Sequence, residues 1–340
     1  MMNKLLTTSI TLLFLPAAAM GCDFCLLQQG ISPLDSLKGS GLRVSQRYTR
    51  VDEVYEGTNH VPNPGAREAF WTTDLSGFFS PRDGWLLLAN LPVRATRVRG
   101  HLHLHDGDHE DEEADADAHA GSSLAIGGNE YEVHPDRGGD EGIGDLSLLA
   151  RYNAFEHHTL THTTLVALTL GVKLPTGSTS GRTNDGEYLD AHTQLGTGSW
   201  DVLAGAAINH SFGRWTLSGN ALASFNGKGE AGNVDHTFGD SLNYDASVRY
   251  RLLPAMQGGD GVSVFASFGV AGEWRGHEKE AGQRVRDSGG HTLYVVPAVQ
   301  INVGQHWIAE LSYRKAVWHD LHQVQLGEDF KLFGSINYLF

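Results

Sequence analysis

Hydrophobic and polar residues alternate along most of the chain beyond residue 40, so that every second residue falls on the same face. In the segment 165–173, four aliphatic residues share one face and a lysine with three smaller residues shares the other: Val166, Leu168, Leu170 and Val172 against Ala167, Thr169, Gly171 and Lys173. The segment 242–252 repeats this pattern. A period of two is typical of β-strands with one apolar and one polar face, and it predicts an all-β fold.

The length of the alternating segments indicates which kind of β-protein this is. Strands that cross a membrane need about 9–11 residues, whereas strands of globular proteins average about 5–6. Twelve segments of the longer kind are delimited by turn residues: 41–55, 69–80, 85–99, 142–155, 163–173, 194–212, 215–225, 239–253, 262–273, 291–303, 306–318 and 326–340. This length favours membrane-crossing strands over a soluble sandwich.

The connections between these segments alternate in length. Tight or moderate turns such as 81–84 and 213–214 alternate with long connections such as 100–141 and 174–193. Short turns on one rim and long loops on the other are typical of outer-membrane barrels, with the short turns on the periplasmic side. We therefore expect residues 41–340 to form a single transmembrane antiparallel β-barrel of about twelve strands, in the bacterial outer membrane and surrounded by its lipid. An even strand number puts both termini on the periplasmic side, and 100–141 becomes a long external loop.

The last segment has the features of a terminal targeting strand. Its outward face is predicted to carry Phe330, Leu332, Gly334, Ile336, Tyr338 and Phe340. A strand with this alternation that ends on an aromatic residue is expected to be recognised by the barrel assembly machinery through Phe340. Tryptophan and tyrosine near other strand ends, such as Trp85 and Trp215, suit the aromatic girdles of such barrels.

The first 40 residues indicate export. Lys4 precedes the short apolar run 5–15, and small residues follow it, so that 1–21 is predicted to be a signal peptide. The segment 22–40 would then be a periplasmic N-terminal segment containing Cys22 and Cys25. This CxxC pair is compatible with a local disulfide, with a site for a soft metal or for thiol exchange, or with lipidation of Cys22. The same segment could plug the barrel or leave it open.

The net charge of the chain argues against a nucleic-acid partner. The chain has a formal charge of −15, and 101–120 alone contributes five aspartates and three glutamates without a lysine or arginine. Nucleic-acid binding needs clustered basic side chains, so no nucleic-acid partner is expected.

This acidic segment is also rich in histidine. Imidazoles suit Zn²⁺ or Cu²⁺, and neighbouring carboxylates raise the local cation concentration. The predicted ligands are His101, His103, His105, His109 and His119, together with Cys22 and Cys25. The alternative is a solvated acidic loop without a metal role. No cofactor is required in either case, and any Zn or Cu would be weakly bound at several sites.

Strand parity assigns charged side chains to the barrel interior. The predicted pore-lining residues are Arg43, Arg47, Asp74, Arg94, Asp145, Arg151, Lys173, Asp201, Asp245, Arg249, Arg251, Glu310, Arg314, Asp329 and Lys331. Some of these are expected to form structural ion pairs, and the remaining surplus is mildly cationic. No Ser/His/Asp spacing stands out among the 18 histidines, so we expect no enzymatic activity and name no catalytic residue.

Three motifs carry a resemblance to a known family: GIGDL at 142–146, GVKLPTG at 171–177 and QLGTGSWD at 194–201. With them, residues 142–340 resemble the "meta-pathway of phenol degradation" family of outer-membrane proteins. The resemblance implies a channel or transporter for a small solute whose identity the sequence does not give. The alternative function is an outer-membrane barrel that binds or helps to transport Zn or Cu through the external histidines and the CxxC pair.

Overall fold

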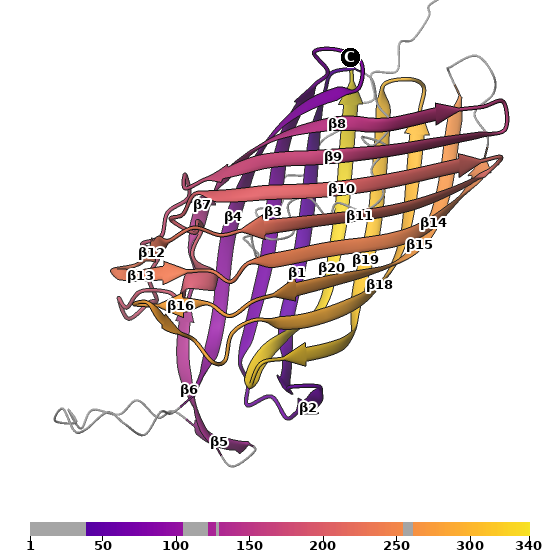
Figure 1. Cartoon of the computed structure of the whole chain (residues 1–340). Coiled ribbons are helices and arrows are strands. Elements are labelled where there is room, and N and C mark those ends of the chain that lie inside the picture. Colours follow the sequence, from indigo (N-terminus) through magenta and orange to yellow (C-terminus); the bar gives the residue numbers. More distant parts are fainter. Residues whose placement is uncertain (1–38, 105–121, 127–128, 254–260) are drawn as a thin grey trace, which may run out of the picture.

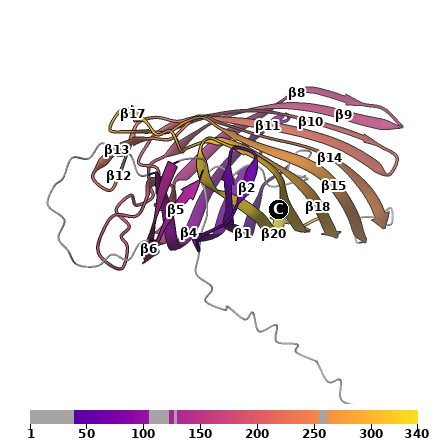
Figure 2. The same ribbon diagram turned by 90° about the horizontal axis from the view of Figure 1, so that it is seen from below.

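The computed structural model describes residues 39–104, 122–126, 129–253 and 261–340. Twelve long antiparallel strands form a closed barrel, because β1 pairs with β20 on one side and with β3 on the other. The wall strands are β1 (Gly41–Glu56), β3 (Arg67–Phe79), β4 (Trp85–Leu104), β8 (Leu146–His158), β9 (His162–Leu174), β10 (Asp201–Phe212), β11 (Trp215–Phe225), β14 (Ser241–Leu253), β15 (Val262–Arg275), β18 (Gly290–Val303), β19 (Trp307–Leu321) and β20 (Val324–Leu339). Figures 1 and 2 show β8 to β11 lying across the barrel from β1 and β20.

Short strands occupy the long connections at the rim opposite the C-terminus (Figure 1). They are β2 (Asn59–Val61), β5 (Ser122–Ile126), β6 (Asn129–Gly138), β7 (Glu141–Ile143), β12 (Gly229–Ala231), β13 (Val234–Thr237), β16 (Lys279–Glu280) and β17 (Gln283–Arg284). The last four form a separate small sheet. One 3₁₀ turn, Ala191–Thr193, lies in the connection between β9 and β10. In the described part of the chain, no helix is long and apolar enough to cross a membrane.

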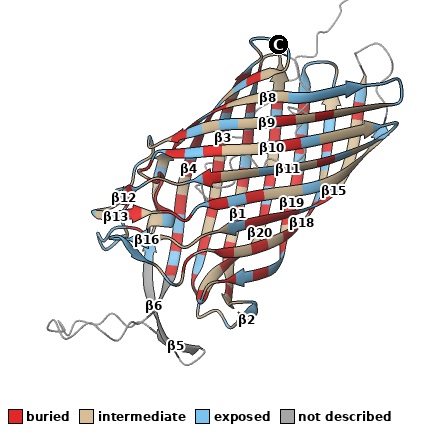
Figure 3. Ribbon diagram, viewed as in Figure 1, coloured by how far each residue is buried: buried red, intermediate tan, exposed pale blue. Residues whose placement is uncertain are grey.

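The wall follows the alternation of the sequence. On β1, Arg43 and Arg47 are buried inside the barrel, whereas Leu42 and Val44 are more than half exposed on the outside. Buried residues alternate with more exposed ones in the same way along β3, β18, β19 and β20 (Figure 3). Apolar side chains that would be exposed to water in a soluble protein thus form the outer surface, as expected where the surrounding medium is lipid.

Aromatic pairs lie on the outer surface at two levels along the barrel. Trp307 and Tyr338 lie with ring centroids 4.7 Å apart near the rim that carries the C-terminus. Farther toward the other rim, in the middle of β1, Tyr48 is a cross-strand neighbour of Trp71, with ring centroids 4.6 Å apart. Two such levels mark the borders of an apolar belt.

The all-β, twelve-strand prediction is confirmed, and most strand boundaries agree within a few residues. The main difference concerns 194–200, which was expected to begin a strand but precedes β10 as an irregular segment. Gly198 has a φ of +66°, a conformation that interrupts a strand and suits glycine. Thr197 and Ser199 are buried in the barrel and bond to carboxylates there. This segment belongs to a connection that folds inward.

Candidate functional site

The barrel interior contains most of the charged side chains that strand parity assigned to it. Ten are buried: Arg43, Arg47, Asp74, Arg94, Asp145, Lys173, Asp201, Glu310, Arg314 and Lys331. Four more are partly buried and alternate with outward-facing apolar residues: Arg151, Asp245, Arg249 and Arg251. The sequence pattern thus locates these groups on the inner wall, and their part in solute passage stays a prediction.

Asp329 does not follow the predicted parity. The pairing of β1 with β20 shifts register near Val51, and this β-bulge directs Glu328 into the barrel instead. Asp329 lies on the opposite side of the strand, where it forms ion pairs with Lys315 and, at 4.0 Å, with Arg50. A bulge inserts one residue and so reverses the direction of the side chains beyond it. The assignment of Asp329 to the pore is therefore corrected.

A buried polar cluster, the signature cluster, consists of Asp145, Lys173, Thr197, Ser199 and Asp201. The Lys173 ammonium lies 2.6 Å from Asp201 Oδ2 and 3.9 Å from Asp145 Oδ2. Thr197 donates to Asp145 through both its backbone N–H and its hydroxyl, each at 2.8 Å. Ser199 donates its hydroxyl to Asp201 at 2.7 Å. All five residues come from the three motifs that carry the family resemblance, so these motifs encode one structural unit.

Two glycines of the motifs allow the chain to approach itself closely here. A Cβ on Gly177 would lie 2.7 Å from the Cα of Gly196, and one on Gly196 would lie 2.6 Å from the Gly177 carbonyl oxygen. Both neighbours are backbone atoms, so neither can turn aside. The Gly177 N–H also donates to Asp145 at 2.9 Å. The motif glycines are therefore required for packing.

In the connection 175–200, which we call the inner loop, residues 192–195 lie against the inner side of the wall formed by β3 and β4, whereas residues 183 and 184 pair with β6. Arg94 donates to the carbonyl oxygen of Leu195 at 3.0 Å, and Thr96 donates to that of Thr193 at 2.7 Å. Leu195 is buried and packs with Phe70 in a small hydrophobic cluster. Both ends of the inner loop meet at the signature cluster, and residues 193–195 are held by β3 and β4.

An ion pair gives the inner loop a further attachment. His192 Nε2 lies 2.9 Å from a carboxylate oxygen of Glu68, at the start of β3. Partial loss of solvation lowers the pKa of His192, whose side chain is still 44% exposed, but the Glu68 carboxylate outweighs this effect and raises the pKa to about 10. His192 is therefore charged at neutral pH, and the attachment is an ionic one.

A second interior cluster lies on β15, β18 and β20. The Lys331 ammonium lies 2.6 Å from Glu273 and 2.8 Å from Glu328, and the Tyr294 hydroxyl donates to Glu328 at 2.6 Å. Lys331 was assigned to the interior from sequence, but its two carboxylate partners were not. Glu273 is separated from Ser263 and Ser267 by an even number of residues on β15. The alternation of the sequence was therefore enough to predict that Glu273 faces the barrel interior. Glu328 faces inward only because of the bulge.

The predicted metal ligands are left untested. His101 and His103 fall on β4. The other five, His105, His109, His119, Cys22 and Cys25, lie outside the described residues, as does the predicted signal peptide. Elsewhere, Asp52, Glu53 and Asp329 form a group of carboxylates with ligand atoms within 4.8 Å of one another. Arg50 and Lys315 form ion pairs with Asp52 and Asp329 of this group. We therefore interpret the group as an ion-pair cluster and not as a metal site.

Comparison with known proteins adds a family and a fold. Residues 89–327 match the profile of the family described as "Putative MetA-pathway of phenol degradation". No curated protein matches the sequence. The structure is similar to the COG4313 outer membrane channel from Pseudomonas putida F1, with a TM-score of 0.63, 15% identity, and coverage of 89% of this chain and 96% of that chain. At this identity the likeness shows the fold alone.

Two other solved structures are more distant. The β domain of the Bordetella autotransporter Brka has a TM-score of 0.45 and 12% identity, covering 89% of this chain and 100% of that one. The toluene transporter TbuX from Ralstonia pickettii has a TM-score of 0.38 and 11% identity, covering 90% and 91%. Neither value is high enough to support a functional argument.

Proposed function

The chain belongs to the family described as "Putative MetA-pathway of phenol degradation", and from this premise we propose that it is an outer-membrane channel for a small solute with a polar group. The family match confirms the resemblance inferred from the three motifs and extends it toward the N-terminus. The observation that carries the proposal is a closed barrel with an apolar outer surface and a charged inner surface.

The outer surface supports a location in the outer membrane. It carries exposed apolar side chains on both sides of the barrel, such as Leu170 of β9 at 63% and Leu311 of β19 at 57%. A closed barrel leaves no strand edge with unpaired backbone groups, which is the condition for a sheet to cross lipid. We expect the protein to sediment with outer membranes and to migrate differently on gels before and after heating. A protein that stays monomeric and soluble without detergent would contradict this location.

The inner surface supports the choice of solute class. A pore lined by rings of charge and hydroxyl groups selects by hydrogen bonding and electrostatics. A purely apolar hydrocarbon would gain little from the guanidinium of Arg249 or the carboxylate of Asp245, whereas a phenol or an aromatic carboxylate would bond to such groups. The family description directs the proposal to small aromatic compounds, and the interior favours their polar members.

The direct test is solute flux. Purified protein in liposomes should increase the uptake of radiolabelled phenol or benzoate over protein-free liposomes, and should increase toluene uptake less. In planar bilayers we expect a small conductance with at most a weak preference for anions. Equal uptake with and without protein, together with no conductance, would contradict a channel. No observation on the described residues favours the alternative role in metal transport.

A further inference from the structure

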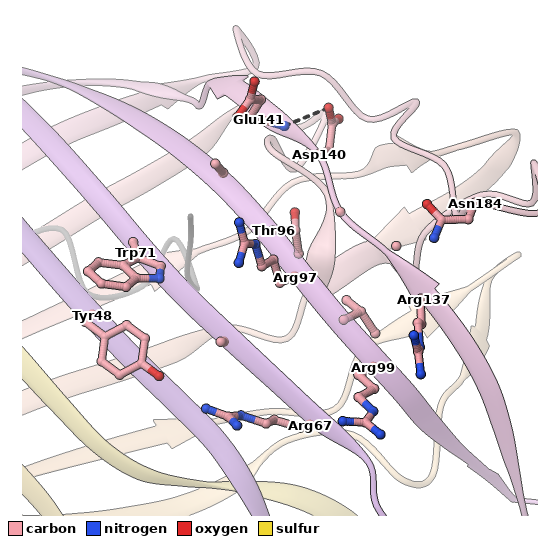
Figure 4. Close-up of a pocket in the computed structure, with 15 residues that line it drawn as sticks. Tyr48, Arg67, Trp71, Thr96, Arg97, Arg99, Arg137, Asp140, Glu141 and Asn184 are labelled. Atoms are coloured by element: carbon pink, nitrogen blue, oxygen red, sulfur yellow. Dashed lines mark hydrogen bonds between the residues drawn. The ribbon is translucent and has the colours of Figure 1, made fainter. Parts of the chain in front are cut away.

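Four arginines line a groove on the outer surface of the barrel, near the rim that carries the long loops. This arginine groove has a volume of about 840 Å³ and is lined by Arg67 of β3, Arg97 and Arg99 of β4, and Arg137 of β6 (Figure 4). Arg67, Arg97 and Arg99 alternate with buried residues such as Glu68 and Val98, which places them on the outer side of the wall.

Three of these arginines are direct cross-strand neighbours. Arg67 is opposite Arg99 in the β3–β4 pairing, and Arg99 is opposite Arg137 in the β4–β6 pairing. Residues directly opposite one another in an antiparallel pair have Cβ atoms about 4.5–5.5 Å apart, and like charges at that distance are destabilising. A bound anion between these three guanidinium groups would offset their mutual repulsion.

The two acidic residues that line the groove, Asp140 and Glu141, form no ion pair with its arginines. Among the residues whose side chains the structure describes, 39–100, 137–253 and 261–340, none of the four arginines forms an ion pair with an acidic side chain. Asp140 and Glu141 also line the groove, and Asp140 accepts a hydrogen bond from the backbone N–H of Glu141. Two acidic and four basic side chains leave the groove with a net positive charge.

The position of the groove identifies the anion. Along the outer side of β3, the side chains pass from Phe79 and Leu75 through Trp71 to Arg67, that is, from apolar through aromatic to basic. Tyr48 and Trp71 line the end of the groove that is nearer the apolar belt. They belong to the aromatic level that marks the border of this belt. Guanidinium groups directly beyond this border lie at the depth of lipid headgroups.

We propose that the arginine groove binds the phosphate groups of the glycolipid in the outer leaflet, whose acyl chains lie along the apolar wall below it. Guanidinium groups bind phosphate bidentately and remain charged at every physiological pH. The exposed side chains of Leu75 and Val93 lie farther along the outer side of β3 and β4, in the apolar belt, and suit acyl chains. The proposal rests on the proposed outer-membrane location, but it is independent of channel activity.

Native mass spectrometry of the full chain in detergent tests the proposal, with bisphosphorylated lipid A as the probe. We expect wild-type protein to bind lipid A, and the double variant R67Q/R99Q to bind about tenfold more weakly, as the loss of charge-assisted bonds predicts. The control variant R286Q removes one positive charge from an exposed loop position on the same rim and should bind as wild type does. Dephosphorylated lipid A and inorganic phosphate should both bind weakly, which separates a lipid headgroup from a free anion.

Thermal unfolding gives a second measurement that does not depend on binding stoichiometry. Without lipid, R99Q should unfold at the same or a higher temperature than wild type, because the substitution relieves repulsion from Arg67 and Arg137. With lipid A, wild type should gain stability and R67Q/R99Q should gain less. Equal lipid A binding by wild type and R67Q/R99Q would overturn the proposal. Binding that appears only after the acids of 106–117 are neutralised would also overturn it, because the chain's own acidic segment would then be the occupant. Liposome flux measured in parallel reports the channel function separately.

Discussion

The ammonium of Lys173 lies 2.6 Å from the carboxylate of Asp201, directly across the pairing of β9 with β10. Lys173 is the last residue but one of β9, and Asp201 is the first residue of β10, so this ion pair closes the base of the inner loop. Both side chains are almost fully buried. Asp201 also accepts hydrogen bonds from Ser199 and from the backbone N–H of Gly227, which helps to offset the cost of burying its charge.

Replacing Lys173 by methionine should strongly destabilise the barrel. The substitution leaves Asp201 and Asp145 buried without their shared cation, and breaking a buried pair in this way costs about 3–5 kcal/mol. We expect a lower unfolding temperature in the heat-modifiability assay and a larger single-channel conductance, because the inner loop loses its attachment. The matched control is Lys228→Met, which removes a lysine from an exposed pair with Asp235 and should change stability by about 0–1 kcal/mol. Equal effects of the two substitutions would show that the buried pair has no special role.

The sequence predicted the wall better than the inner loop, for a physical reason. Alternation is a local property that propagates along a strand, so the inward directions of Arg43, Arg47 and Lys331 follow from parity alone. A bulge inserts a single residue and reverses which side chains face inward beyond it. Glu328 and Asp329 are adjacent and both acidic, so the sequence does not indicate which of the two faces the interior.

The inner loop depends on contacts between distant residues. Thr197 is buried because it bonds to Asp145, 52 positions earlier, and neither residue alone indicates that contact. The Gly, Thr and Ser content of 175–200 is equally compatible with an external loop. Only the family motifs indicated that these segments belong together, and they gave no geometry.

Replacing Gly177 by alanine should disturb the inner loop without affecting the wall. The added Cβ would lie within 3 Å of the backbone of Leu195 and Gly196, and overpacking of this kind costs about 1–3 kcal/mol. The control is Gly77→Ala on β3, where the nearest atom to an added Cβ is a side-chain carbon of Leu42 at 3.7 Å. We expect protease digestion within 175–200 to accelerate for G177A alone. Similar digestion of both variants would argue against close packing at Gly177.

The attachment of the inner loop should weaken in alkaline solution. The pKa of His192 is raised to about 10 by Glu68 against an unfolded value of about 6.5. The stabilising contribution of the charged pair is therefore complete below about pH 6.5 and is lost as the pH rises through about 10. Wild-type conductance should rise between neutral pH and pH 10, and His192→Gln should show the higher conductance already at neutral pH. A conductance of His192→Gln that follows the wild-type pH dependence would contradict this assignment.

Removal of Phe340 should impair barrel assembly. Its side chain is 69% exposed on the outside and packs at the edge of Tyr338, where the assembly machinery could reach it. We expect the deletion to lower outer-membrane levels without changing export across the inner membrane, as measured by fractionation and periplasmic accumulation. Phe340→Tyr keeps an aromatic side chain at this position and should assemble normally. Normal levels of the deletion variant would show that the targeting signal lies elsewhere.

The last prediction concerns the external histidines, most of which lie outside the described residues. A peptide spanning 101–119 should bind Zn²⁺ or Cu²⁺ more tightly near pH 7.5 than at pH 5, because histidine must be neutral to act as a ligand and its ordinary pKa is about 6.5. At pH 5 the carboxylates remain, and they favour hard cations, so the preference for transition metals should disappear first. Isothermal titration at both pH values, with Ca²⁺ as the hard-cation control, separates the two interpretations of this segment. Equal affinities for Ca²⁺ and Zn²⁺ at pH 7.5 would identify it as a solvated acidic loop, because carboxylates alone would then account for the binding.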